Sequence, residues 1–204
     1  MNELNRKKYV KAISDFKVCN QEIVSTYSNG YLGKKVYKVV LNDGTSRLCE
    51  QITKNNCNGD AVVIIPITIN GDYVVVVQSR PNTEETVSIE FPAGMVDENE
   101  SFLEAARREL LEETGYIADN LYLLEEHYQD QGCSKAIIKT FVAEGCKRVN
   151  NMKLDRDEKL AYVEMSYEDI LDLVKNEKKT RPGFKDANSK IAFMQYILKK
   201  KGIM

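Results

Sequence analysis

Three glutamates near the middle of the chain have a spacing that places carboxylates on one helix face. Glu109, Glu112 and Glu113 are separated by three and four positions, so a helix brings them to one strip of its surface. Unpaired carboxylates this close repel one another, which raises their pKa values and destabilises the helix. A bound divalent cation removes this conflict, and carboxylate oxygens suit Mg²⁺ or Mn²⁺. The alternative is an ordinary amphipathic helix with solvated glutamates.

The sequence around these glutamates predicts a helix from Asn99 to Thr114. Apolar residues recur at positions three and four apart and form a stripe that we expect to face a core: Leu103, Ala106 and Leu110. Arg108 precedes Glu112 by four positions, so it can pair with that carboxylate. Gly115 can adopt the left-handed conformation that ends a helix.

The whole segment, GMVDENESFLEAARRELLEETGY from Gly94 to Tyr116, resembles the signature of the Nudix hydrolase family. That signature reads G-x5-E-x7-R-E-U-x-E-E-x-G-U, where U is a bulky apolar or aromatic residue. Every fixed position is filled, by Gly94, Glu100, Arg108, Glu109, Leu110, Glu112, Glu113, Gly115 and Tyr116. The resemblance implies an α/β fold, an α/β/α sandwich with a mixed sheet. It also implies that Glu109, Glu112 and Glu113 bind metal and that Arg108 belongs to the catalytic site.

Two flanking segments resemble the ADP-ribose pyrophosphatase branch of that family. They read VQSR, ending at Arg80, and IEFPAGMVD, beginning at Ile89. The likeness implies that Arg80 contacts phosphate, that Glu90 lies in the active site, and that the backbone carbonyl of Ala93 is a further metal ligand. Arginine suits the first role because it can hold a diphosphate with two hydrogen bonds.

One position departs from the branch. Its members usually carry a proline sixteen positions after the last glycine of the signature, and Gln131 stands there. The surrounding residues still resemble the branch's D-P-G-x-S loop, which makes Gly132 and Ser134 candidate substrate contacts. The chain has no tryptophan to stack on a base, and Tyr31 is the candidate replacement.

The general base is sought on a loop well after the signature, where the branch often carries an acidic residue. Asp155 and Glu158 lie in such an acidic segment, and both are candidates. A solvated acidic turn is the alternative interpretation of that segment.

The elements that must position these residues follow from hydrophobic periodicity. We expect strands at residues 61–69, 73–78, 87–91, 121–126 and 136–144, and helices at residues 166–175 and 188–199. The first two strands are nearly continuous in Val and Ile, so both faces of the sheet should be covered. Asn70-Gly71 supplies the tight turn between them.

The N-terminal part is interpreted as a small β-rich appendage, residues 1–58, preceding a Nudix domain, residues 59–204. Residues 36–41 and 47–52 flank Asn42-Asp43-Gly44, which is typical of a hairpin. The polar run from Asn55 to Asp60 marks the boundary. In the ADP-ribose branch a segment of this kind contributes to a homodimer and to the adenine pocket.

Composition narrows the classes of function and the cellular location that we expect. The 204 residues are 43% hydrophobic with a net charge of −2, which gives no support for nucleic-acid binding. The longest apolar stretch, Ala61 to Ile67, is too short to span a membrane, and no targeting segment is visible. Five cysteines without metal-site spacing favour reduced thiols in the cytoplasm.

The sequence therefore predicts an Mg²⁺- or Mn²⁺-dependent homodimeric enzyme. It would hydrolyse the diphosphate bond of ADP-ribose or a related nucleoside diphosphate sugar to AMP and a sugar phosphate. The alternatives are a housecleaning hydrolase of nucleoside di- or triphosphates, and a catalytically silent Nudix module that binds a nucleotide.

Overall fold

The structure is a computed structural model that describes residues 3–55, 57–84, 86–149, 152–154, 159–175 and 183–203. The chain divides into two compact units. Unit 1 comprises residues 1–59 together with the loop 130–136, and unit 2 comprises residues 60–129 and 137–204. The loop therefore belongs to the same unit as the N-terminal segment, although the sequence interpretation assigned it to the Nudix domain.

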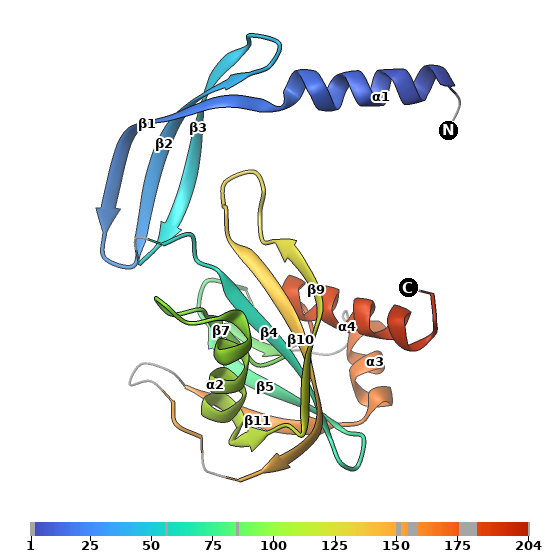
Figure 1. Cartoon of the computed structure of the whole chain (residues 1–204). Coiled ribbons are helices and arrows are strands. Elements are labelled where there is room, and N and C mark those ends of the chain that lie inside the picture. The colour runs from blue at the N-terminus through green and yellow to red at the C-terminus, as the bar shows by residue number, and fades with distance from the viewer. Residues whose placement is uncertain are drawn as a thin grey trace. The chain divides into compact units, whose positions relative to one another are not determined.

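The described residues of unit 1 form one helix and a three-stranded antiparallel sheet (Figure 1). Its elements are α1 (Glu3–Phe16), β1 (Val18–Asn29), β2 (Leu32–Leu41) and β3 (Ser46–Lys54). Gly44, between β2 and β3, has φ +86°, which a glycine adopts without steric cost. The sequence interpretation of a mostly β segment missed α1. Its apolar residues are spaced for a helix but stay exposed, so no core burial accompanies that pattern.

Unit 2 is built on a mixed sheet. Its strands are β4 (Ala61–Thr68), β5 (Tyr73–Arg80), β6 (Thr86–Glu90), β7 (Ala93–Met95), β8 (Tyr116–Ile117), β9 (Asn120–Tyr128), β10 (Ile137–Arg148) and β11 (Leu160–Met165). The order β11-β5-β4-β10-β8 forms its main path, with β6 on β5, β7 on β4 and β9 on β10. Strands β4 and β10 are parallel, and the other pairs are antiparallel.

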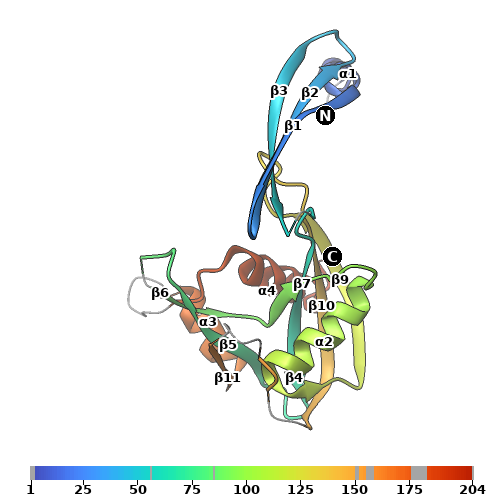
Figure 2. The ribbon, with the colours of Figure 1, turned by 90° about the vertical axis from the view of Figure 1, so that its left-hand side faces the viewer.

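Helices cover both faces of this sheet, as Figures 1 and 2 show. They are α2 (Phe102–Thr114), α3 (Tyr167–Lys175) and α4 (Ala187–Lys200). Val62 and Ile64 of β4 pack in a cluster with α2, whereas Val63 and Ile65 pack in a second cluster with α3 and α4. Alternate side chains of a strand point to opposite faces, so this division makes three layers. The expected α/β/α sandwich with a mixed sheet is confirmed.

Helix α2 begins later than the sequence predicted. Asn99 has φ +66°, outside the right-handed helical region, so it cannot be the first helical residue. Ser101 caps the helix instead, in a reciprocal capping box with Glu104. Leu103 is 39% exposed, so its predicted place on the buried stripe is wrong. Gly115 ends the helix at φ +75°, as expected.

The buried face of α2 includes two of the three signature glutamates. It carries Ala105, Ala106 and Leu110, together with Glu109 and Glu113. Small alanines let α2 approach the sheet closely, and this approach carries two carboxylates out of water. The fold thus creates the carboxylate cluster whose electrostatic cost the spacing had suggested.

Two further findings concern the whole chain. No helix within the described ranges is long and apolar enough to cross a membrane. All five cysteines are free thiols, and Cys146 alone among them is buried.

Candidate active site

Two of the three signature glutamates are buried against strand β7. Glu109 and Glu113 are 8% and 3% exposed, whereas the side chain of Glu112 is 39% exposed. The backbone N–H of Ala93 donates to Oε2 of Glu113 over 3.0 Å. A hydrogen bond to a carboxylate from a backbone N–H stabilises its charged form. The site therefore begins as a buried acidic pair fixed between α2 and β7.

Gly94 leaves the space that Glu109 occupies. A β-carbon built at position 94 would lie 1.9 Å from Oε1 of Glu109 and 2.0 Å from its Cδ. These distances are far below contact, so only glycine lets this carboxylate lie against the backbone. Strand β7 pairs with β4, which fixes Gly94 opposite Val62.

Arg108 joins the acidic residues of the motif into one network. Its guanidinium donates to Glu100 through two bonds of 2.9 Å, to Glu109 over 2.7 Å and to Glu112 over 3.1 Å. A further bond of 2.9 Å reaches the carbonyl oxygen of Met95. The hydrogen bonds from Arg108 hold the pKa of Glu100 below its ordinary value. The predicted pairing of Arg108 with Glu112 is present, and Arg108 orients two of the three signature glutamates.

A second ion pair lies at the end of β5 and β6. Nε and Nη2 of Arg80 donate to the two carboxylate oxygens of Glu90 over 2.8 and 2.6 Å. Glu90 is 4% exposed, and Gln78 donates to it over 3.3 Å. These hydrogen bonds raise the pKa of Arg80, and the charges of Asp186 and Glu113 raise it further. Glu90 is thus the carboxylate that Arg80 contacts directly.

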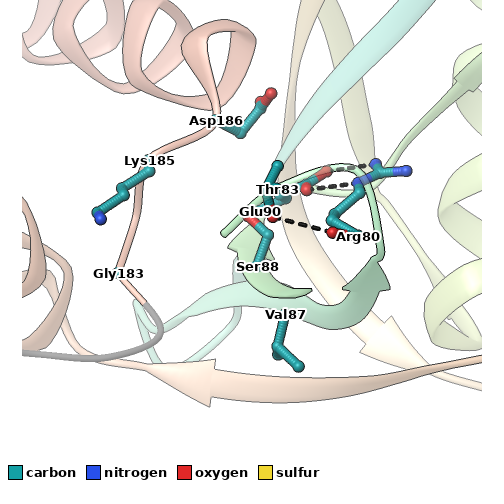
Figure 3. Close-up of a pocket in the computed structure, with 8 residues that line it drawn as sticks. All are labelled: Arg80, Thr83, Val87, Ser88, Glu90, Gly183, Lys185 and Asp186. Atoms are coloured by element: carbon teal, nitrogen blue, oxygen red, sulfur yellow. Dashed lines mark hydrogen bonds and ion pairs between the residues drawn. The ribbon is translucent and has the colours of Figure 1, made fainter. Parts of the chain in front are cut away.

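A cavity of about 210 Å³ opens beside this pair. Figure 3 shows the residues that line it: Arg80, Thr83, Val87, Ser88, Glu90, Gly183, Lys185 and Asp186. The structure therefore brings the predicted Arg80 and Glu90 together. Sequence reasoning missed Ser88, Lys185 and Asp186. Asp186 did carry a signal, because it is the N-cap residue of a helix expected nearby, but nothing local linked that cap to Arg80.

The donor set of α2 fits a divalent cation, although its carboxylates are turned to protein partners. Within the described ranges, no three His, Cys, Asp or Glu side chains converge on one point. Glu109 and Glu112 face Arg108, and Glu113 faces the N–H of Ala93. Hard carboxylate oxygens in a partly dry site are the ligands that Mg²⁺ and Mn²⁺ prefer. The cradle at Gly94 keeps one of them next to the backbone.

The remaining predicted substrate contacts lie in unit 1. Tyr31 is 52% exposed in the turn between β1 and β2. Gly132 and Ser134 lie in the loop that bonds to β3, where the N–H of Ile52 donates to the carbonyl of Cys133 over 2.7 Å. Gly132, Ser134 and the unusual Gln131 line a cavity of about 460 Å³ within unit 1. Tyr31 does not line that cavity.

The two candidates for the general base, Asp155 and Glu158, lie outside the described residues. The ligand role predicted for the carbonyl oxygen of Ala93 stays a prediction. The N–H of Ala93 donates to Glu113, and Ala93 lies opposite Val63 in the sheet.

Residues 58–186 match the NUDIX domain, and the chain belongs to the Nudix family. It is 34% identical over 119 residues to the ADP-ribose pyrophosphatase of Bacillus subtilis, a match that covers 58% of this chain and 64% of that protein. The chain thus spans less than two thirds of the length of that relative. It is also 29% identical over 151 residues to the GDP-mannose pyrophosphatase of Yersinia enterocolitica, covering 70% of this chain and 78% of that one.

A solved structure entitled an ADP compounds hydrolase has the same fold. The two superpose with a TM-score of 0.71 at 24% sequence identity, over 92% of this chain and 96% of the other. This likeness extends the shared architecture beyond the Nudix segment to nearly the full chain.

Proposed function

We propose that this protein hydrolyses the diphosphate bond of ADP-ribose or a related nucleoside diphosphate sugar and releases AMP and a sugar phosphate. The observation that carries the proposal is the buried acidic pair of α2, Glu109 and Glu113, held against Ala93 and Gly94. Burying two carboxylates with a third beside them is costly, and Arg108 balances only part of that charge, so a bound divalent cation would balance the rest. The similarity to pyrophosphatases of nucleotide sugars supports the choice of substrate.

Glu109, Glu112 and Glu113 would hold the cation, with the carbonyl of Ala93 as a further ligand. Mg²⁺ is the proposed ion, with Mn²⁺ as the alternative, because all these ligands are hard oxygens. When bound, such an ion would neutralise charge on the diphosphate and lower the pKa of the attacking water.

Two arginines position the metal ligands and the substrate. Arg108 holds Glu109 and Glu112 in one orientation through hydrogen bonds of 2.7 and 3.1 Å. Arg80 keeps Nη1 available to an anionic substrate while Nε and Nη2 are fixed by Glu90. A guanidinium fixed in this way binds a diphosphate oxygen without first losing rotamer freedom. Glu90 is thus proposed to act on substrate through Arg80.

The base pocket that the resemblance implies is proposed to lie in unit 1. Gly132 and Ser134 line its cavity together with Tyr37, a nearly buried aromatic residue. Gln131 lines the same cavity, at the position where the ADP-ribose branch usually carries proline. Tyr31 is retained as a candidate for stacking on a base, and Asp155 and Glu158 as candidates for the general base.

We further propose that the protein is a homodimer of the cytoplasm. Exposed large apolar side chains concentrate in unit 1, where twelve of them are found among the described residues. Apolar surface of this extent marks an interaction face. Free cysteines throughout the chain fit a reducing compartment.

Product analysis tests the activity. Purified protein with Mg²⁺ is incubated with ADP-ribose, ADP-glucose, UDP-glucose, NADH and 8-oxo-dGTP, and the products are separated. We expect AMP and ribose 5-phosphate to appear fastest from ADP-ribose. Fastest turnover of 8-oxo-dGTP would favour the housecleaning alternative, and no turnover of any compound would favour a substrate outside this panel or the silent binding module.

A matched pair of variants tests the role of the acidic cluster. Glu113→Gln should abolish turnover while the thermal unfolding temperature stays close to that of the wild type. Glu104→Gln, on the exposed first turn of the same helix, is the control. Glutamine also functions in a capping box, so this variant should keep full activity. Unchanged turnover in Glu113→Gln would contradict the metal assignment.

A further inference from the structure

His127, the only histidine of the chain, lies between two hydrogen-bond acceptors. Its Nδ1 is 3.2 Å from Oε1 and 3.3 Å from Oε2 of Glu125, and its Nε2 is 3.3 Å from Oδ1 of Asn188. The side chains of His127 and Glu125 are 18% and 13% exposed, so their contact is largely shielded from water. The ring therefore joins strand β9 to the first turn of α4.

The acceptor on the strand side is a carboxylate held in a fixed position. Thr140 of β10 is fully buried, and its hydroxyl donates to Oε1 of Glu125 over 2.6 Å. Thr140 and Glu125 are also paired directly in the sheet, where His127 pairs with the apolar Ile138. The neighbouring strand thus holds Glu125 in place and brings no charge of its own against His127.

On the helix side, His127 faces an amide group. The charged residues nearest to Asn188 in the sequence are Lys185, Asp186 and Lys190. Lys185 and Asp186 line the cavity of about 210 Å³, and residues two positions apart, such as Asn188 and Lys190, do not share a helix face. The carboxylate on β9 is thus the charged group that contacts the ring.

Both contacts of His127 are hydrogen bonds in one protonation state of the ring. A neutral imidazole has one N–H and one bare nitrogen, whereas the imidazolium donates from both nitrogens. If the neutral ring donates to Glu125, the lone pair of Nε2 faces the oxygen of Asn188, and the two acceptors repel. Uptake of a proton at Nε2 replaces this repulsion with a hydrogen bond from a charged donor. Histidine is the side chain that ordinarily changes its charge between pH 5 and 8.

The first turn of α4 is joined in turn to the strand that carries Glu90. The backbone N–H of Phe91 donates to Oγ of Ser189 over 2.9 Å, and both residues are buried. Phe91 follows Glu90 directly, and Glu90 accepts two hydrogen bonds from Arg80 (Figure 3). A shift of this helical turn would therefore move the backbone next to Glu90.

We propose that His127 is a positioning residue of the active site. As an imidazolium it bridges Glu125 and Asn188 and holds the first turn of α4, which holds the strand end where Glu90 fixes Arg80. Loss of the proton releases that turn, so Arg80 is held best on the acidic side of neutral pH. The effect on catalysis rests on the proposed function, which assigns Arg80 to the substrate, whereas the bridge itself does not.

Amide hydrogen exchange measures the bridge independently of activity. The exchange rate of the Phe91 N–H, followed by NMR, reports how often its bond to Ser189 opens. Comparing the wild type with His127→Gln at the same pH cancels the intrinsic pH dependence of exchange. At pH 6 we expect about tenfold faster exchange in the variant, the contribution of one hydrogen bond from a charged donor. At pH 8 the two rates should be equal. Equal rates at pH 6, or the same difference at both pH values, would overturn the proposal.

Variants of Asn188 test the other end of the bridge while the histidine stays in place. Asn188→Ala removes the acceptor at a helical position that alanine favours, so α4 should still form. Its Phe91 N–H should exchange as fast at pH 6 as that of His127→Gln. Asn188→Asp provides an acceptor again and should restore slow exchange. Met194→Ala, at a position of α4 that is 61% exposed, is the control and should match the wild type. Exchange as fast in Asn188→Asp as in Asn188→Ala would contradict the bridge.

Enzyme kinetics tests the consequence for the active site. The measurement is the ratio of kcat/KM for ADP-ribose between the wild type and His127→Gln from pH 6 to pH 8, which cancels ionisations common to both proteins. We expect a ratio of about ten at pH 6 that falls to about one at pH 8. A purely structural role would give the same ratio at every pH, and that result would overturn the positioning role. Absence of ADP-ribose hydrolysis by the wild type would defeat the proposed activity, and the exchange measurements would still decide whether the bridge exists.

Discussion

The carboxylate of Glu109 lies against the α-carbon of Gly94, so that a β-carbon at position 94 would come within 1.9 Å of Oε1. The two residues are fifteen positions apart, on a short strand and on the helix that follows it. Glycine at the start of the Nudix signature therefore has a steric cause in this fold. It makes room for a carboxylate that Arg108 holds from the other side.

Gly94→Ala should inactivate the enzyme by displacing Glu109. A misplacement of about 1 Å at a catalytic group can cost on the order of 100-fold in rate, and we expect a loss of at least that size in kcat. Steady-state kinetics with ADP-ribose and thermal unfolding are the measurements. The double variant Gly94→Ala/Glu109→Ala removes the clash, so it should regain stability without regaining activity. A fully active Gly94→Ala protein would show that Glu109 need not occupy this position.

The ion pair between Arg108 and Glu100 should make stability depend on pH. Hydrogen bonds from Arg108 lower the pKa of Glu100 below its ordinary value of 4.5. The resulting stabilisation is present above that value and is lost as the pH falls through the lowered pKa. Glu100→Gln should therefore lower the unfolding free energy by about 1 kcal/mol at pH 7, since both side chains are partly exposed. The difference from the wild type should shrink below pH 4.5. A difference that stays constant down to pH 3 would contradict this origin.

Local patterns in the sequence predicted much of this structure. The spacing of Glu109, Glu112 and Glu113 placed them on one helix face, and Gly115 marked the end of that helix. These signals can be recognised locally because the side-chain pattern of a helix repeats every three to four residues. The start of α2 was misplaced because Asn99 adopts a left-handed conformation that composition does not reveal.

Relationships across long stretches of sequence could not be predicted in the same way. Ser189 accepts a hydrogen bond from the N–H of Phe91, 98 positions away, and Asp186 lines the same cavity as Arg80. No periodicity in the sequence encodes this bond between the first turn of α4 and Phe91. The assignment of Gly132 and Ser134 to unit 1 likewise depends on tertiary contacts with β3.

Cys146 should resist alkylation in the native protein. It is 1% exposed, and burial raises the pKa of its thiol to about 11, so the reactive thiolate is scarce at pH 8. Cys19 and Cys57 are exposed and should react. Iodoacetamide treatment followed by peptide mass spectrometry measures the modification at each cysteine. Treatment in denaturant is the control and should modify all five. Modification of native Cys146 as fast as Cys19 would contradict the packing of β10.

The exposed apolar face of α1 should contribute to the proposed dimer. Ile13 and Phe16 are 56% and 65% exposed in unit 1. Ile13→Glu/Phe16→Glu places two charges on that surface, where burial without partners is costly. We expect a shift from dimer to monomer, measured by light scattering coupled to size-exclusion chromatography. Lys8→Glu on the same helix adds a negative charge elsewhere and should leave the dimer unchanged. A wild type that is monomeric at all concentrations would refute the proposed dimer itself.

Variants of the Arg80–Glu90 ion pair can separate the role of Arg80 in holding the substrate from its role in stabilising the fold. Arg80→Ala leaves the 4% exposed carboxylate of Glu90 without its strongest partner. We expect a loss of about 1–2 kcal/mol in unfolding free energy, less than for a fully buried pair because the Arg80 side chain is 46% exposed. The double variant Arg80→Ala/Glu90→Gln removes the unpaired charge and should recover most of that stability. Its kcat/KM should remain about as low as that of Arg80→Ala, because the guanidinium is still missing.

Glu90→Gln alone should lower kcat/KM less, since Arg80 remains but is held by weaker bonds. Recovery of activity in the double variant would mean that Arg80 serves the fold and does not contact the substrate.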